Sequence, residues 1–260
     1  MSTVLDTSTT SRVPFARLVK VELRKSYDTR AGIWLLGITA FLSTLIMVIA
    51  LIAVIVQDEA ISLNDFVSIG NFISGFLLPV LGIMLVTGEW NQRTAMVTFT
   101  LEANRGRVVG AKLVAGLLLA LIVSLIATVA AVVVNGIYAA VQGDADWHFG
   151  ILRLLGFLLT QLIAMTTGFA FATLFLNTAA AIVVFFAYSF LVPTILAIAA
   201  QFFDWVESIR PWIDFTQAQT PLFDAKMHGE DWAHLLVSGL IWLGIPLALG
   251  LWRILRAEVK

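Results

Sequence analysis

The polar side chains best placed to do chemistry fall in one short segment, residues 88–112, which reads GEWNQRTAMVTFTLEANRGRVVGAK. An acidic residue, Glu89, lies near its start, and basic residues surround a central apolar stretch. This composition suits a short helix that docks on a protein partner. It suits equally a positively charged loop that only sets membrane topology. The candidate residues are Glu89, Arg93, Thr94, Met96, Phe99, Leu101, Arg105, Arg107 and Lys112.

The rest of the sequence offers little for catalysis or for a bound cofactor. There is no cysteine, which excludes disulfides, thiolate metal sites and cysteine nucleophiles. The three histidines fall outside the long apolar runs or at their edges, so a haem within the membrane would lack axial ligands. The stretch GRVVGAK is too short for a phosphate-binding loop, and Leu113 follows its lysine where Ser or Thr is required. We expect no catalytic residue, no metal site, no cofactor bound by this chain and no nucleic-acid partner.

The elements that position these residues are membrane helices. Hydrophobic residues make up 60% of the chain and charged residues 13%, against about 25% charged in a globular domain, so lipid is the expected solvent. A spanning segment needs about 20 apolar residues and must be helical, because lipid offers the backbone no other hydrogen-bond partner. The predicted spans are residues 31–56, 66–88, 113–141, 154–176, 178–200 and 235–252.

One uncharged stretch, residues 154–203, holds two of these spans. As a single helix it would be about 75 Å long, more than twice the thickness of the hydrocarbon core. The most polar interior point, Asn177 with Thr178, is the expected reversal.

The basic residues predict the orientation. All but three of the 16 Lys and Arg residues lie on one side of the predicted spans, and Arg153, Arg210 and Lys226 are the exceptions. Because basic residues favour the inner side, both termini are expected in the cytoplasm of a multi-pass protein of the cell inner (plasma) membrane. Residues 1–12 are expected to be a flexible cytoplasmic N-terminus and residues 253–260 a cytoplasmic tail.

Residues 13–30 show an amphipathic helical pattern. The apolar residues recur every four positions on one side, as in a helix that lies in the plane of the membrane interface. They are Phe15, Val19, Leu23 and Tyr27. Glu22 falls on that apolar side, where an unpaired carboxylate is costly, so we expect it to reach the interface or to pair with a neighbouring arginine. The candidate residues of this helix are Arg17, Lys20, Glu22 and Arg24.

Residues 201–232 are rich in aromatic side chains and carry two prolines. We expect short helices in or on the outer leaflet. They could form an interfacial cap without a ligand or a lid over a substrate exit, and the sequence does not favour either. Within the predicted spans there is no Asp, Glu, Lys, Arg or His, which argues against an ion-coupled carrier. The few polar residues that could line a pathway are Asn135, Gln161, Thr166 and Thr167.

The segment from Glu89 to Lys112 resembles the loop found in permeases of the ABC-2 family of ATP-binding cassette transporters. The matching features are Glu89 at the end of the second span, Arg93-Thr94, the apolar stretch from Met96, a basic residue at 105 or 107, and Lys112. The resemblance covers the whole layout and implies an all-α integral membrane fold of the type V exporter kind. That fold has six transmembrane helices, an N-terminal in-plane amphipathic helix, a cytoplasmic coupling helix, and external interfacial helices before the last span.

This resemblance also implies partners. Permeases of the family bind two copies of a separate ABC ATPase, which holds ATP and Mg, and pair with a second permease. Here we expect a homodimer surrounded by membrane lipid. The loop from Glu89 to Lys112 would carry the coupling helix, with Met96, Phe99 and Leu101 as its docking face. Glu89 would pair with Arg93 or Arg105. The implied function is export of a lipophilic or amphipathic substrate: a drug-like compound, as in multidrug export, a lipid or a hydrophobic peptide.

A second hypothesis stays open: a membrane scaffold or sensor subunit that recruits a cytoplasmic partner without transporting anything. A membrane enzyme is disfavoured, because no acid, base or nucleophile constellation lies within the spans.

Overall fold

The computed structural model describes residues 13–92 and 94–256, so the predicted N-terminal segment 1–12, Arg93 and the last residues of the predicted tail, 257–260, lie outside the described part. Every named element among the described residues is a helix, and an isolated parallel bridge joins Ser62 to Asp146. Six helical segments are long and apolar enough to cross a membrane. The predicted all-α fold with six transmembrane helices is therefore confirmed.

The six spanning segments are α2 (Arg30–Gln57), α3 (Leu63–Asn91), α5 (Arg105–Gln142), α6 (Ile151–Phe175), α7 (Thr178–Ala200) and the combined run Gly229–Arg256. That last run comprises α11 (Gly229–Gly239), a π-helical segment η1 (Leu240–Gly244) and α12 (Ile245–Arg256). Shorter helices are α1 (Phe15–Asp28), α4 (Ala95–Leu101), α8 (Asp204–Ile213), α9 (Phe215–Ala218) and α10 (Thr220–Phe223).

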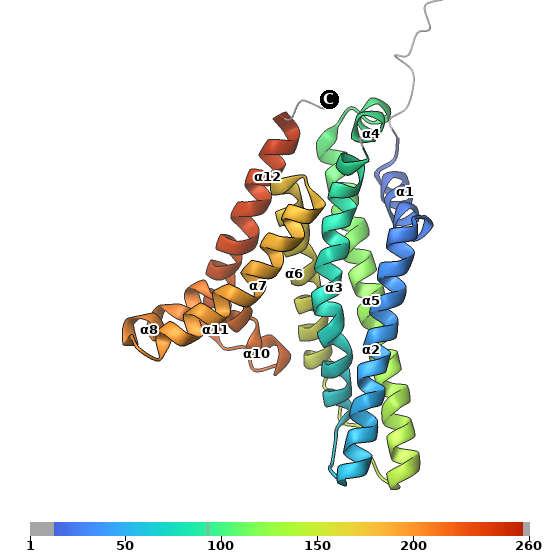
Figure 1. Cartoon of the computed structure of the whole chain (residues 1–260), viewed down its shortest axis with the longest axis vertical. Helices are drawn as coiled ribbons and strands as arrows, with labels where there is room; N and C mark the ends of the chain where they lie inside the picture. The colour runs from blue at the N-terminus through green and yellow to red at the C-terminus, as the bar shows by residue number, and fades with distance from the viewer. Residues whose placement is uncertain (1–12, 93, 257–260) are drawn as a thin grey trace, which may run out of the picture.

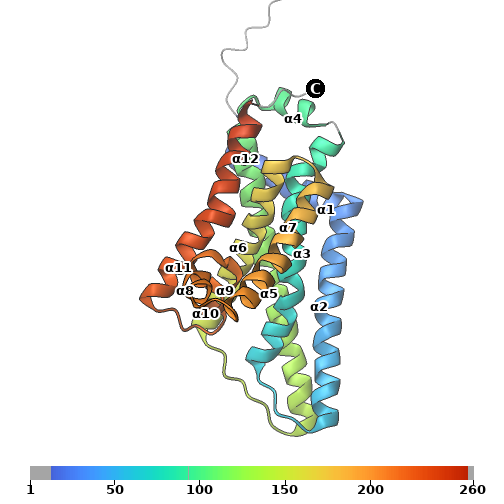
Figure 2. The same ribbon diagram turned by 60° about the vertical axis from the view of Figure 1, so that its left-hand side comes forward.

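The helices form a bundle with one projecting side (Figure 1). Helix α3 packs against α2, α5 and α6, while α12 packs along α6. Helices α7, α8 and α11 splay away from α2 and α5, and α1, α4 and the final turns of α12 gather at one end of the bundle (Figures 1 and 2). We call this the α4 end.

Several helices extend past the charge-free runs because polar side chains cap them. Helix α5 begins at Arg105, so three basic residues assigned to a loop are helical: the Asn104 side chain accepts a hydrogen bond from the Arg107 amide at 3.1 Å. Helix α3 begins at Leu63 because Ser62 and Asp65 form a capping box. Charge marks where a helix leaves the hydrocarbon core, whereas a cap marks where the helix ends.

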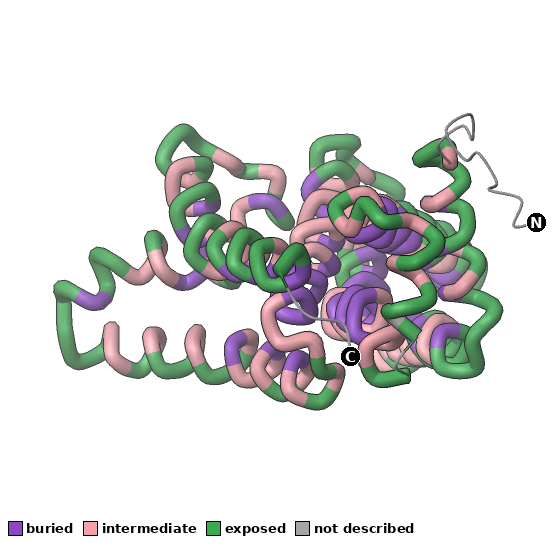
Figure 3. The backbone as a smooth tube through the Cα atoms, turned by 90° about the horizontal axis from the view of Figure 1, so that it is seen from above, coloured by how far each residue is buried: buried purple, intermediate pink, exposed green. Residues whose placement is uncertain are grey.

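The interface of α3 with α6 is the centre of the structure. A Cβ atom on Gly168 would lie 2.3 Å from the Pro79 carbonyl oxygen, so only glycine lets the two backbones approach this closely. Met165 and Phe169 flank this contact and are almost completely buried. Figure 3 shows most buried positions gathered in the middle of the bundle, with mainly exposed and intermediate positions over the projecting side.

The aromatic segment before the last span folds into α8, α9 and α10 and packs on the bundle. Phe215 and Leu222 belong to a buried cluster with residues of α6, α7 and α12. The Trp242 indole nitrogen donates to the Ile213 carbonyl at 2.7 Å and so joins η1 to the end of α8. This segment is therefore an integral part of the packing of the α7–α12 side.

At the end opposite α4, two connections are tied together. The Leu63 amide donates to the Asp146 carbonyl at 3.1 Å beside the Ser62–Asp146 bridge. The Tyr138 hydroxyl donates to the Glu59 carbonyl, also at 3.1 Å. The α2–α3 turn is thus fastened to the end of α5 and the chain that follows it.

Candidate functional site

Helix α1 is anchored to the bundle through a narrow buried stripe. Val19, Glu22 and Ser26 are its buried residues, and α1 packs mainly against α5 and α2. Phe15 and Tyr27, predicted to lie on the same apolar side, are 41% and 53% exposed. The observed spacing of three to four residues follows one helix face more closely than a strict repeat of four, which drifts around the helix.

The junction of α1 with α2 is a sharp bend. Thr29 leaves the helical conformation, and its hydroxyl accepts a hydrogen bond from the Gly32 amide at 3.2 Å. A Cβ atom on Gly32 would lie 1.8 Å from the Ser26 carbonyl oxygen. Only glycine permits this close turn, which brings the end of α1 beside the start of α2.

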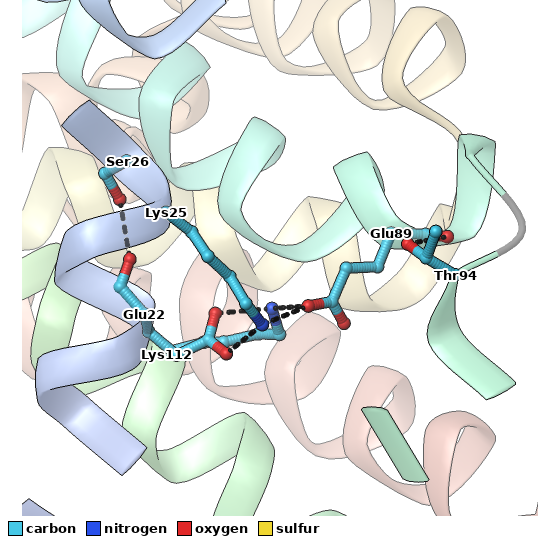
Figure 4. A network of polar contacts seen from close by, with 6 residues as sticks. All are labelled: Glu22, Lys25, Ser26, Glu89, Thr94 and Lys112. Carbon is cyan, nitrogen blue, oxygen red and sulfur yellow. Dashed lines mark hydrogen bonds and ion pairs between the residues drawn. The ribbon is translucent and has the colours of Figure 1, made fainter. Parts of the chain in front are cut away.

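Two carboxylates and two ammonium groups meet beneath this bend (Figure 4). Lys112 donates to Glu22 Oε2 at 2.7 Å, and its ammonium lies 3.1 Å from Glu89 Oε1. Lys25 donates at 2.7 Å both to Glu22 Oε1 and to Glu89 Oε1. We call Glu22, Lys25, Glu89 and Lys112 the charge cluster. It joins α1 to the last turns of α3 and the first turns of α5.

Burial makes the charge cluster sensitive to the loss of any member. The side chains of Glu22 and Lys112 are only 6% and 7% exposed, and an isolated charge at such a position would be very costly. Burial alone would lower the pKa of Lys25, but hydrogen bonds to Glu22 and Glu89 outweigh it and raise that pKa above its ordinary value. The cluster therefore holds its charges by mutual neutralisation.

The sequence predicted only part of this arrangement. Glu22 is paired, as expected, but with two lysines rather than an arginine. Glu89, expected to pair with Arg93 or Arg105, contacts Lys25 and Lys112. Lys25 was missed, although its position three residues after Glu22 was a usable signal.

The other candidates on α1 lie on its outer side. Arg17, Lys20 and Arg24 are exposed. Arg24 donates to Asp28 at 2.9 Å, and this hydrogen bond raises the pKa of the Arg24 guanidinium. These cations are available to water, headgroups or a partner rather than to the charge cluster.

The apolar residues of α4 point in two directions. Phe99 packs back on its own chain, with Trp90 edge-on at 6.3 Å and the Arg105 guanidinium over its ring at 5.0 Å. Met96 and Leu101 are 48% and 80% exposed. The predicted docking residues therefore separate into an anchor, Phe99, and an outward apolar surface.

Basic residues at the start of α5 tie α4 to neighbouring segments. Arg105 donates to the Ile254 carbonyl of α12 at 2.9 Å. Arg107 donates to Glu102 at 2.9 Å and also to the Val13 carbonyl. Thr94 is exposed at the start of α4, and its hydroxyl is 3.5 Å from the Glu89 carbonyl oxygen (Figure 4).

A cavity of about 400 Å³ lies between the α1–α2 bend and the ends of α3 and α4. All four members of the charge cluster line it, together with apolar residues of α2 and α3. Exposed residues such as Gln92 and Val97 form part of its wall, so it opens to the surroundings.

The predicted pathway residues lie mostly inside the single chain. Gln161 is buried and donates to the Asn71 carbonyl and to Ser74 of α3, at 2.8 and 2.6 Å. Asn135 is fully buried and donates to the Asp146 carbonyl at 3.3 Å. Thr167 is buried and Thr166 half-buried, and each hydroxyl donates to a backbone carbonyl one turn earlier. Gln161 thus joins α6 to α3, Asn135 joins α5 to the connection that follows it, and the two threonines bond within α6.

The comparison with known families fits this arrangement. A model described as an ABC-2 family transporter protein matches residues 38–259, which include five entire spanning helices, most of α2, and α4. The chain belongs to the ABC-2 transporter family. No match was found among curated protein sequences. Family membership makes this chain a multi-pass membrane component of a transporter that normally works with an ABC ATPase. Glu89 and Lys112 lie in the matched region, whereas Glu22 and Lys25 precede it.

Proposed function

We propose that this chain is the permease subunit of an ABC exporter, with the α4 end in the cytoplasm. Two copies of a separate ATPase bind there and hydrolyse ATP with Mg, and the chain itself is not catalytic. The observation that carries this proposal is the link between the outward apolar surface of α4 and the charge cluster: two cluster members, Glu89 and Lys112, lie on the helices that directly precede and follow α4.

The charge cluster is a candidate for transmitting movement. A partner pressing on Met96 and Leu101 acts on α4, which Phe99 holds against Trp90 of α3 and Arg105 of α5. Glu89 and Lys112 in turn connect the adjoining helix ends to α1. Displacement of α4 is therefore shared by three helices, and nucleotide binding in the partner would bias one of two arrangements of this unit.

The exposed surfaces support an apolar or amphipathic substrate and a second permease. Only 17% of an 18-residue apolar stretch of α7 is buried within the chain. Its exposed side chains include Val183, Phe190 and Leu191, 52–65% exposed. Lipid can cover this face, but so can α7 of a second copy, and a path between two such faces would be lined by apolar groups that favour a lipophilic compound, a lipid or a hydrophobic peptide.

Co-expression tests the proposal directly. The tagged permease is produced together with its cognate ABC ATPase, and the complex is purified with and without ATP and Mg. We expect two permeases and two ATPases to co-purify and the reconstituted complex to hydrolyse ATP faster when a lipophilic substrate is present. Recovery of the permease alone under every nucleotide condition would count against the assignment. A stable complex that neither transports nor responds to substrates would favour a scaffold or sensor.

A further inference from the structure

We propose that the cavity lined by the charge cluster binds one phospholipid whose headgroup carries a primary ammonium, with phosphatidylethanolamine as the model ligand. The cavity volume of about 400 Å³ lies within the range of small-molecule sites, roughly 300–1,000 Å³. It would hold the headgroup and the first part of an acyl chain. This lipid is a resident ligand of the α1–α2 bend rather than the transported substrate.

The cavity has the polarity that such a lipid requires. Leu35 of α2 and Leu81, Met84 and Leu85 of α3 form its apolar part, on the side of the membrane-spanning segments. Its polar part is made by the charge cluster with Ser26 and Thr98, at the α4 end. A soluble polar ligand would leave the apolar walls in contact with water. A lipid instead places its acyl chain against the leucines and its headgroup beside the charges.

The charges of the wall indicate a zwitterionic headgroup. Among the described residues, two carboxylates and two ammonium groups line the cavity, and these side chains together carry no net charge. A purely anionic ligand would compete with Glu22 and Glu89 for the lysines, and a purely cationic ligand would compete with the lysines for the carboxylates. A zwitterion brings one charge for each sign and leaves the cluster neutral.

Two atoms are placed to receive the two charged groups. The Lys25 side chain is 40% exposed, whereas that of Lys112 is 7% exposed, so Lys25 can reach a phosphate. Glu89 uses Oε1 for both of its lysine contacts, and Figure 4 shows its other carboxylate oxygen turned away from both lysines. That oxygen can accept a hydrogen bond from a primary ammonium, which has three N–H donors. A trimethylammonium group has none.

This proposal does not depend on transport or on an ATPase. It requires only that the chain crosses a membrane, and it holds for whichever leaflet lies at the α4 end. Lipid binding is therefore measured on the full-length chain alone. A negative result would leave the proposed permease function intact, and failure of the permease function would leave the lipid site standing.

The first experiment uses the wild-type chain. It is reconstituted in nanodiscs containing equal amounts of phosphatidylethanolamine, phosphatidylcholine and phosphatidylglycerol with identical acyl chains, then released and examined by native mass spectrometry. We expect one phosphatidylethanolamine to be retained about tenfold better than phosphatidylcholine. A tenfold preference corresponds to the weaker end of the strengths known for hydrogen bonds to charged groups. Equal retention of all three lipids, or preferential retention of phosphatidylglycerol, would overturn the proposal.

Variants then locate the bound lipid. Leu35→Trp and Met84→Trp fill the cavity from opposite helices without touching the charges, and each should abolish the preference. Leu45→Trp, at a 40% exposed position of α2 that does not line the cavity, should retain it. Glu89→Gln should lower retention of phosphatidylethanolamine and raise that of phosphatidylglycerol. A preference that survives both filling variants would place the lipid elsewhere and refute the site.

Discussion

The Lys112 ammonium lies 2.7 Å from Glu22 Oε2, joining two buried residues 90 positions apart in the sequence. One belongs to α1 and the other to the third spanning helix. The contact gives α1 a fixed place against the bundle, whereas an amphipathic helix held only by lipid would be free to slide. Its loss should therefore affect both stability and the position of α1.

Replacing Lys112 with methionine should destabilise the chain by about 3 kcal/mol, because removing one partner of a buried ion pair leaves a costly charge behind. Unfolding in detergent, followed by circular dichroism, measures this change. Arg24→Met removes an exposed pair on the same α1 helix and should leave the unfolding midpoint unchanged. In a double-mutant cycle with Glu22→Gln, the two effects should be clearly non-additive; simple additivity would contradict the direct coupling.

The contribution of Lys25 to folding stability should be lost at alkaline pH. Because its folded-state pKa is raised above the unfolded value of about 10.4, the protonated lysine contributes stability fully below that pH and loses it as pH rises through the folded-state pKa. Unfolding midpoints of wild type and Lys25→Met should differ by a constant amount up to about pH 10 and then converge. A difference that widened at high pH would reverse the sign of this coupling.

The α3–α6 contact should not tolerate even one added methyl group at Gly168. Gly168→Ala would place a Cβ 2.3 Å from the Pro79 carbonyl oxygen, so we expect destabilisation of about 1–3 kcal/mol or more. Gly37→Ala on α2 is the matched control, since its Cβ would meet nothing within 4 Å. It should be neutral or mildly stabilising, because alanine favours helix over glycine. Thermal unfolding of the two purified variants compares them; equal midpoints would contradict the close approach.

Two apolar residues of α4 should behave differently. Leu101→Ser changes an 80% exposed side chain and should weaken ATPase association several-fold while leaving the unfolding midpoint of the isolated permease unchanged. Phe99→Ala removes the contacts with Trp90 and Arg105 and should lower that midpoint as well. Co-purification with the ATPase and thermal unfolding of the permease measure the two effects. Unchanged association of Leu101→Ser would remove this surface from the proposed interface.

The spanning helices could be predicted because lipid imposes a simple rule on composition and length. The reversal near Asn177 followed from the same rule, since an uncharged stretch of that length cannot be one helix. Helix ends such as Arg105 could not, because a capping side chain, rather than charge, decides where the backbone stops being helical.

The charge cluster could not be predicted from the sequence, for a different reason. Glu22, Glu89 and Lys112 each drew notice alone, but their meeting depends on the bend at Thr29 and on the packing of α1 against α5. Gln161 illustrates the same limit: a polar residue in a span suggested a pathway, and the structure shows its amide nitrogen donating to Asn71 and Ser74 of a neighbouring helix. Polarity indicates that a partner is needed and does not identify it.

The tie between the α2–α3 turn and the connection after α5 has a mechanical consequence. The Ser62–Asp146 bridge at one end and the charge cluster at the other fasten α3 and α5 to each other near both ends of the bundle. Two helices joined near both ends tilt together and resist bending. A large rearrangement that keeps both contacts must therefore take place across α6, where the splayed α7–α12 side packs against this pair.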